Sequence, residues 1–256
     1  MKLSVLASGS KGNSCYVETK DRCFLIDLGT TSLYVEKQLK TLNKTGNDIA
    51  GIFLTHSHVD HVNGLQVFIK KYNPIIYLTE KIYNELKQTI NFKNIIFIDK
   101  EVILDDLIVT VIPTSHDADD SVGYVFEQDD HSFVYITDTG YINVKNHKKL
   151  INKNVYVLES NHDVEMLMNN EHYPYAIKQR ILGDQGHLSN EDSAYYLSKF
   201  IGDKTTSIIL AHLSEQNNTK DIALDTLYRT LEEYDKHCNY ILVAEQKERT
   251  ELIEVW

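Results

Sequence analysis

The stretch Thr55-His56-Ser57-His58-Val59-Asp60-His61 determines how this sequence is interpreted. Three histidines and one aspartate fall within residues 56–61, directly after the apolar run 49–55. Neutral imidazoles and carboxylates are ligands that suit Zn²⁺, Mn²⁺ or Fe²⁺. A solvated polar turn is the alternative, but a buried strand end rarely collects so many ligand-type side chains without a metal to satisfy them. The stretch therefore predicts a metal site, with His56 and His58 on one ion and Asp60 and His61 turned toward a second.

Short apolar runs and longer amphipathic runs lie on both sides of this stretch. Strands are expected at 3–7, 15–18, 23–27, 49–55, 75–78, 95–98, 107–112, 122–126, 133–137, 154–158, 206–211 and 240–244. Helices are expected at 32–42, 62–72, 80–90, 190–201 and 220–234, the first with Leu33, Leu39 and Leu42 at helical spacing behind a Thr/Ser cap. Many strands followed by alternating strands and helices indicate an α/β fold, with a sheet-on-sheet core and helices outside.

Composition narrows the class of protein. The 256 residues hold only three prolines and no visible linker or repeat, so we expect a single domain over 1–256. No apolar run is long enough to span a membrane, no signal peptide is recognisable, and the three cysteines form no C-x-x-C pair, so a reducing cytoplasm is expected. A net charge of −11 argues against coating nucleic acid by bulk charge, but it allows a local grip on phosphate.

The pattern H-x-H-x-D-H after a strand resembles the metallo-β-lactamase fold superfamily. The later ligands of that superfamily can be found in order, as His116 in IPTSHDA, Asp138 in YITDTG and His212 in IILAHLS. The resemblance implies a four-layer αββα sandwich with two divalent ions. It places one ion on His56, His58 and His116 and the other on Asp60, His61 and His212, with Asp138 bridging. Two ions about 3.5–4 Å apart can share a water and lower its pKa toward neutrality.

Further motifs narrow the resemblance to the YycJ/WalJ branch of the superfamily, whose members are regarded as DNA-directed 5′→3′ exonucleases with a proposed link to DNA repair. These motifs are SGSKGN, THSHVDH, SHDA, TDTGY, ESNHD, KQRILGDQGHLSNEDSA and AHLSEQNN, from residue 1 to about residue 221. Related tRNA-maturing endonucleases use a Glu–His pair beside the metals, and by similarity this pair is Glu159 and His187. The resemblance implies that His187 protonates the leaving alkoxide, that Glu159 orients His187, and that Asp60 helps to orient the attacking hydroxide.

Several polar and basic residues are candidates for substrate binding, although a hairpin turn, a helix cap or a solvated face would explain each of them. Small residues in the loop 8–14 allow backbone N–H groups and hydroxyls to approach an anion, and Lys178 and Arg180 lie near Tyr173 and Tyr175, where they could bind phosphate beside a stacked base. The candidates are Ser8, Ser10, Asn13, Asn161, Lys178, Arg180, Ser189 and Asn190.

Together these features predict a dinuclear-metal phosphodiesterase, a 5′→3′ exonuclease that acts on DNA ends carrying a 5′-phosphate. A hydrolase of small or cyclic phosphodiesters is the nearest alternative, and a metal-binding regulatory partner of a cell-wall two-component system is a third. A β-lactamase is disfavoured because no secretion signal is recognisable. The ligand set accepts Zn²⁺, Mn²⁺ and Fe²⁺ alike. The sequence leaves open whether the protein is a monomer or a homodimer.

Overall fold

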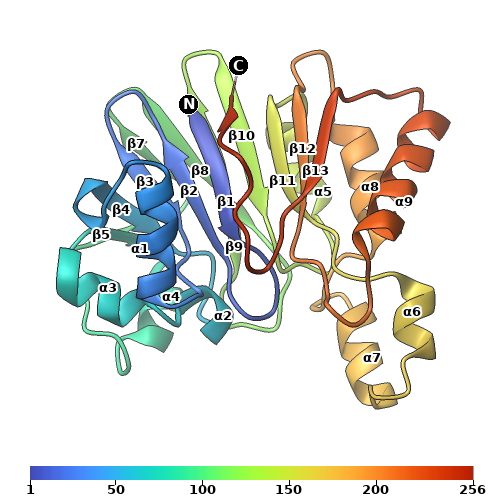
Figure 1. Cartoon of the computed structure of the whole chain (residues 1–256), viewed down its shortest axis with the longest axis horizontal. Coiled ribbons are helices and arrows are strands. Elements are labelled where there is room, and N and C mark those ends of the chain that lie inside the picture. The colour runs from blue at the N-terminus through green and yellow to red at the C-terminus, as the bar shows by residue number, and fades with distance from the viewer. Residues whose placement is uncertain (256) are drawn as a thin grey trace.

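Two seven-stranded sheets lie face to face, and helices cover their outer sides (Figure 1). This computed structural model describes residues 1–255. The strand order is β14-β1-β2-β3-β4-β5-β6 in the first sheet and β13-β12-β11-β10-β9-β8-β7 in the second. The arrangement confirms the expected four-layer αββα sandwich.

The first sheet consists of β1 (Lys2–Ala7), β2 (Ser14–Glu18), β3 (Cys23–Ile26), β4 (Ile49–Phe53), β5 (Ile75–Leu78), β6 (Ile95–Phe97) and β14 (Ile253–Glu254). The second consists of β7 (Glu101–Leu104), β8 (Leu107–Pro113), β9 (Val122–Gln128), β10 (His131–Ile136), β11 (Val155–Glu159), β12 (Ser207–Ala211) and β13 (Tyr240–Val243). The helices are α1 (Ser32–Thr41), α2 (Val59–Val62), α3 (Leu65–Tyr72), α4 (Glu80–Leu86), α5 (Val144–Leu150), α6 (Val164–Asn169), α7 (Tyr175–Leu182), α8 (Asn190–Phe200) and α9 (Lys220–Glu233), with a short 3-10 turn at Gly46–Asp48.

Each expected strand and helix corresponds to an observed one, with corrections at the ends. The run 49–55 leaves the sheet after Phe53, and the helix expected at 62–72 is preceded by the separate short helix α2. In α1 the Thr31 side chain accepts a hydrogen bond from the Tyr34 N–H, as a cap should. Leu33 is 62% exposed, and the buried face of α1 instead includes Val35 and Leu39.

Two apolar cores hold the layers together. The larger lies between the sheets and extends beneath α1, α3 and α4, and the smaller packs the outer face of the second sheet against α5, α8 and α9. Aromatic rings fill the space between the sheets: Phe53 stacks on Tyr77 with centroids 4.5 Å apart and meets Phe126 edge-on. Burying such rings supplies much of the stability of a core. No helix within residues 1–255 is long and apolar enough to cross a membrane.

The direction of the strands places the site at one edge of the sandwich. In the first sheet β3, β4 and β5 run parallel, and in the second β10, β11 and β12 run parallel. Parallel strands present their carboxyl ends at one edge of a sheet, which is where sites form in open α/β sheets. The segments that follow these strands meet at the lower edge of the sandwich in Figure 1, beside α2.

Candidate metal centre

The side chains expected to bind metal come from loops and helix starts that follow strand ends. His56 and His58 follow β4, Asp60 and His61 lie in α2, His116 follows β8, Asp138 follows β10, and His212 comes directly after β12. All of them converge at the same edge of the sandwich and form two neighbouring clusters. The fold thus brings together side chains that lie far apart in the sequence.

The first cluster consists of His56, His58 and His116, whose ligand atoms lie within 4.8 Å of one another. His116 Nε2 is 3.3 Å from His58 Nδ1. Because three neutral imidazoles can share one cation, this cluster has the donor set of a zinc or manganese site.

The second cluster consists of Asp60, His61, Asp138 and His212, again within 4.8 Å. The Asp138 carboxylate lies between the clusters: Oδ2 is 3.1 Å from His61 Nε2 and Oδ1 is 3.8 Å from His116 Nε2. Since Oδ1 also lies 3.5 Å from His212 Nε2, the carboxylate is within 4 Å of histidines from both clusters, a position compatible with a bridging ligand.

Orphaned donor atoms inside the clusters show that they suit cations. His56 Nε2 and His212 Nε2 are buried and have no hydrogen-bond partner within residues 1–255. Buried polar atoms normally have partners, and an unmade interaction here is costly. Metal ligation would satisfy these atoms together, so the two clusters are compatible with a dinuclear metal site.

Carboxylates also set the protonation of this site. Burial lowers the pKa of His61, but Asp138 and Asp27 outweigh it and raise that pKa to about 10. Burial likewise opposes the charge of Asp138, yet His212 and His61 hold the pKa of its carboxyl well below the usual range. A metal ligand must be deprotonated, so an entering cation would displace these protons.

Asp27 supports the second cluster and was missed at the sequence level. It follows β3, is fully buried, and its Oδ2 lies 2.7 Å from His61 Nδ1. Thr55 donates to the same carboxylate through its N–H and its hydroxyl, at 2.8 and 2.7 Å. With Nδ1 bound to Asp27, His61 presents Nε2 to the cluster, which is the usual way an outer carboxylate orients a ligand histidine. The signal in the sequence was that Asp27 directly follows the fully apolar strand β3.

Three residues of the site have a left-handed backbone. Asp27, Asp138 and His212 have φ of +58°, +55° and +56°, the left-handed region that costs energy for any side chain. Gly29 packs under α2, where an added Cβ would lie 1.6 Å from the Asp60 backbone oxygen. Tight packing thus holds these side chains in place against their local preferences.

Glu159 and His187 form the pair that the resemblance implied. Glu159, the last residue of β11, is fully buried, and its Oε1 lies 2.7 Å from His187 Nδ1 and 2.9 Å from His212 Nδ1. Its Oε2 accepts the backbone N–H groups of Thr139 and Leu188, at 3.0 and 3.2 Å. Burial would raise the pKa of Glu159, but the charge and hydrogen bond of His187, with the hydrogen bond of His212, lower it to about 2. The carboxylate therefore joins the metal cluster to His187.

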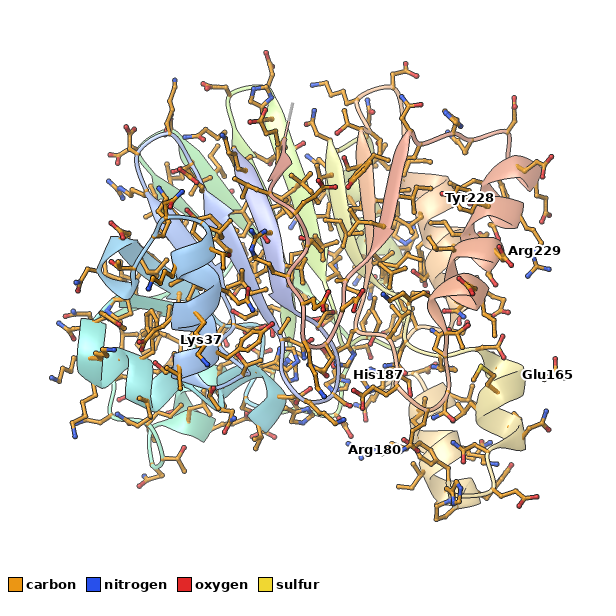
Figure 2. The ribbon with its side chains drawn as sticks, viewed as in Figure 1. Lys37, Glu165, Arg180, His187, Tyr228 and Arg229 are labelled. Carbon is orange, nitrogen blue, oxygen red and sulfur yellow. The ribbon has the colours of Figure 1, made fainter. Side chains whose placement is uncertain are left out.

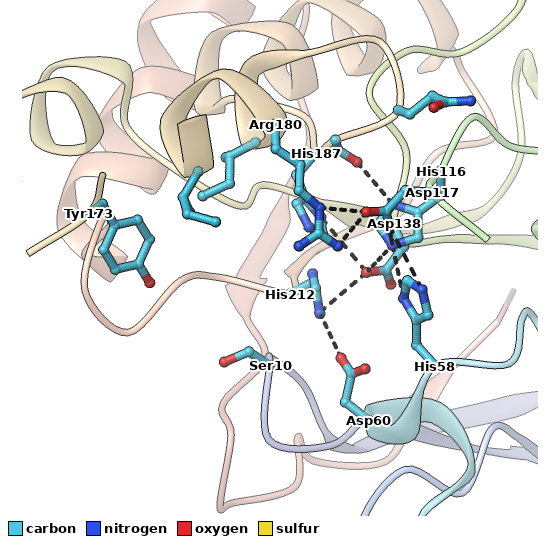
Figure 3. A pocket seen from close by; sticks show the side chains of 14 residues that line it. Ser10, His58, Asp60, His116, Asp117, Asp138, Tyr173, Arg180, His187 and His212 are labelled. Carbon is cyan, nitrogen blue, oxygen red and sulfur yellow. Dashed lines mark hydrogen bonds and ion pairs between the residues drawn. The ribbon is translucent and has the colours of Figure 1, made fainter. Parts of the chain in front are cut away.

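A cavity of about 340 Å³ opens over the clusters (Figure 3). Its lining includes the ligands His58, Asp60, His116, Asp138 and His212 together with Ser10, Asp117, Tyr173, Ile177, Arg180, Ile181, Gln185, Gly186 and His187. Such a site, with acidic and imidazole groups converging in a cavity, is the usual form of a hydrolytic centre.

Two of the residues expected to bind substrate reach this cavity. Ser10 is exposed on one side, and Arg180 reaches in from α7, where its guanidinium pairs with Asp117. Asp117 itself lies near the first cluster, with Oδ1 3.3 Å from His116 Nε2. Lys178, on the same helix as Arg180, instead donates to the Met168 carbonyl at 2.6 Å and does not line the cavity.

The remaining candidates for substrate binding are buried and engaged. The Ser8 hydroxyl accepts the His212 N–H at 2.7 Å, and the Asn161 amide donates to the His212 carbonyl at 2.9 Å. The Asn13 NH₂ group donates to the Gly9 carbonyl and also lies within hydrogen-bonding distance of Asp60 and His61. These three hold the ligand-bearing loops, so we propose a positioning role for them.

Ser189 and Asn190 stabilise the start of α8 through hydrogen bonds. Ser189 caps that helix by accepting the Asp192 N–H at 3.0 Å. Asn190 is 1% exposed and is bound to Ser160 and Asn218. We propose that both fix the loop that carries His187, because their polar atoms are used within the fold.

Comparisons with known proteins agree with this geometry. A family model described as a beta-lactamase superfamily domain matches residues 22–212. Exodeoxyribonuclease YycJ of Bacillus anthracis is 39% identical over 238 residues, covering 91% of this chain and 90% of that protein. Exodeoxyribonuclease WalJ of Streptococcus pneumoniae is 37% identical over 241 residues, covering 91% and 89%. The solved structure of the metallo-β-lactamase fold protein YhfI from Bacillus subtilis shares the fold, with a TM-score of 0.72 and 14% identity over 97% of this chain and 98% of that one. The chain therefore belongs to the beta-lactamase superfamily of metal-dependent hydrolases, in the family of the YycJ and WalJ proteins.

Proposed function

We propose that the protein is a phosphodiesterase that degrades DNA from its 5′ ends in the 5′→3′ direction, with a role in DNA repair. One observation carries the chemical part of this proposal: His187, held by the buried Glu159, lines the same cavity as members of both ligand clusters. The names of the YycJ and WalJ relatives support DNA as the substrate.

The two clusters would hold the ions, with His56, His58 and His116 on one, Asp60, His61 and His212 on the other, and Asp138 bridging. When bound there, two divalent ions would supply an activated water and stabilise the negative charge on the phosphoryl oxygens. Mn²⁺, Zn²⁺ and Fe²⁺ all suit these donors.

His187 is placed to handle the leaving group. Its Nδ1 is bound to Glu159, which leaves Nε2 for the cavity. When water attacks phosphorus, the bond from phosphorus to one sugar oxygen breaks, and that oxygen leaves as an alkoxide. We infer that His187 donates its Nε2 proton to this oxygen, while Glu159 holds the ring and stabilises its charged form.

Arg180 and Asp60 are placed to orient the reactants. In the described part of the chain, Arg180 is the only lysine or arginine that lines the cavity, so it is the residue that would contact a phosphate oxygen. The Asp60 carboxylate lines the opposite side and would orient the attacking water as well as bind metal.

The charge of the chain suits attack at ends. With a net charge of −11 and Arg180 as the one lysine or arginine that lines the cavity in the described residues, the protein has little means of binding DNA along its length. We therefore propose that affinity is concentrated at the metal centre and at the 5′-phosphate of a DNA end. In this proposal the enzyme works in the cytoplasm, as a monomer or a homodimer.

The proposal is tested by replacing His187 with Ala and measuring degradation of a 5′-phosphorylated oligodeoxynucleotide. Turnover should fall about 10²–10⁴-fold because the proton donor is lost, while metal content stays as in the wild type. The control is His237→Ala, since His237 is an exposed histidine outside the cavity. Equal turnover in the His187 variant would contradict the assignment.

Two further experiments distinguish the exonuclease from a hydrolase of small phosphodiesters and from a regulatory partner. Hydrolysis of bis(p-nitrophenyl) phosphate without degradation of DNA would favour an enzyme for small phosphodiesters, which the modest cavity also admits. An Asp138→Ala variant that lacks activity but still complements the cellular role would favour a regulatory partner.

A further inference from the structure

Helix α7 and Tyr173, two residues before it, form an apolar wall that hydrolysis does not use. None of the residues of α7 is buried, yet Ile177 and Ile181 face the cavity, and Tyr173 joins them from the preceding turn. In Figure 1, α6 and α7 extend beyond the sandwich at the site edge. Apolar side chains on a helix without a core of its own indicate a contact surface.

This wall continues from the phosphate site. Arg180 lies on the same helix as the two isoleucines and pairs with Asp117 beside the first metal cluster. Figure 3 shows Tyr173 on the side of the cavity away from His58 and Asp138, with Arg180 between them and Ser10 below. One part of the cavity is therefore polar and suits a phosphate, and the adjoining part is apolar and ends in an aromatic ring.

The size of the cavity limits what can enter. Its volume of about 340 Å³ is near the lower end of the range for small-molecule sites. A space of that size is comparable to one nucleotide and smaller than a base pair with its two sugars. A planar base linked to a phosphate is also the part of a DNA end that has both an apolar face and an anionic group.

We propose that Tyr173, Ile177 and Ile181 form the subsite for the base of the 5′-terminal nucleotide, with Tyr173 stacking on it. This inference rests on the proposed function and adds a substrate requirement. The terminal base must be unpaired to enter, so single-stranded or frayed 5′ ends are degraded faster than blunt duplex ends.

The test compares two 5′-phosphorylated oligodeoxynucleotides that differ only in whether the terminal nucleotide carries a base or is abasic. Tyr173→Ala should lower kcat/KM about tenfold on the oligonucleotide with the base, mainly through KM, and leave the abasic one unchanged. Tyr173→Phe keeps the ring and should behave as wild type. Tyr228→Ala is the matched control, because Tyr228 is 52% exposed on α9, away from the cavity (Figure 2).

A binding measurement supports the kinetic one. Calorimetric titration of the metal-loaded protein should give tighter binding of deoxyadenosine 5′-monophosphate than of deoxyribose 5-phosphate, and Tyr173→Ala should remove that difference. An equal loss on both oligonucleotides, or no loss on either, would overturn the base subsite while leaving the exonuclease intact. If the wild type degrades neither oligonucleotide with any metal, the proposed function fails and the subsite fails with it.

Discussion

Glu159→Gln is the substitution that tests the organisation of the site most severely. Both oxygens of the carboxylate accept hydrogen bonds, which a carboxamide cannot do. Its Oε2 accepts two backbone N–H groups, from Thr139 and Leu188, and its Oε1 faces Nδ1 of both His187 and His212. Glutamine has one oxygen and one NH₂ group. Either the two backbone N–H groups or the two histidines must therefore face an NH₂ donor where they now face an oxygen acceptor.

Either orientation of the amide damages the site. If its NH₂ group faces the backbone, two buried N–H donors lose their acceptor, at about 1–3 kcal/mol each in free energy of unfolding. If the NH₂ group faces the histidines, their protons must move to Nε2, and His212 Nε2 can then no longer bind a metal. We expect turnover to fall at least about 100-fold and affinity for the second ion to fall about 10- to 100-fold.

The assay combines three readouts on purified protein: metal content after gel filtration, turnover on a 5′-phosphorylated oligodeoxynucleotide, and the melting temperature. Glu165→Gln is the control, because Glu165 is exposed on α6 and makes the same change of charge (Figure 2). A Glu159→Gln variant with wild-type metal content and turnover would refute the reasoning that one carboxylate serves both histidines.

Three further changes test other parts of the site. Arg180→Ala should raise KM about tenfold in steady-state kinetics by removing a charge-assisted contact to phosphate, whereas Arg229→Ala on α9 should change nothing (Figure 2); an unchanged KM would rule Arg180 out. Asp27→Asn should weaken metal binding about 10- to 100-fold in a titration with Mn²⁺ or Zn²⁺, because His61 loses its orienting carboxylate; Asp21→Asn, an exposed change, is its control. Treatment with EDTA should abolish activity and lower the melting temperature, since bound ions stabilise the fold, and added Mn²⁺ should restore both; activity that survives metal removal would contradict a metal centre.

The gathering of the ligands was predictable because each follows the end of a recognisable strand. The apolar runs before His56, His116, Asp138 and His212 all become strands of the sandwich. Parallel neighbours then bring their carboxyl ends to one edge, so short motifs that are distant in sequence meet.

Elements with little buried surface were missed for a physical reason. Helix α7 has no buried residue, so its sequence carries no inward-facing stripe that marks a helix. Edge strands β7 and β14 are short or partly exposed, with little of the pattern of a buried strand. Tertiary contacts, such as the pairing of Arg180 with Asp117, help to place these elements.

Polar side chains in the loops were the least predictable. Residue type does not separate an amide that binds substrate from one that holds a loop, because both need the same donors and acceptors. The side chains of Asn13 and Asn190 hydrogen-bond to neighbouring loops, whereas those of Ser10 and Arg180 reach the cavity. Only the folded arrangement decides which hydrogen-bonding groups are already used.

The most direct test of the proposed exonuclease is a digestion of 5′-phosphorylated, 3′-labelled DNA by the wild-type protein loaded with Mn²⁺ or Zn²⁺. The proposal predicts successive removal of nucleotides from the 5′ end, so that the 3′ label remains on steadily shorter fragments, and strong inhibition when the 5′-phosphate is absent. Release of the label first, cuts in the interior, or intact DNA beside metal-loaded protein would contradict it.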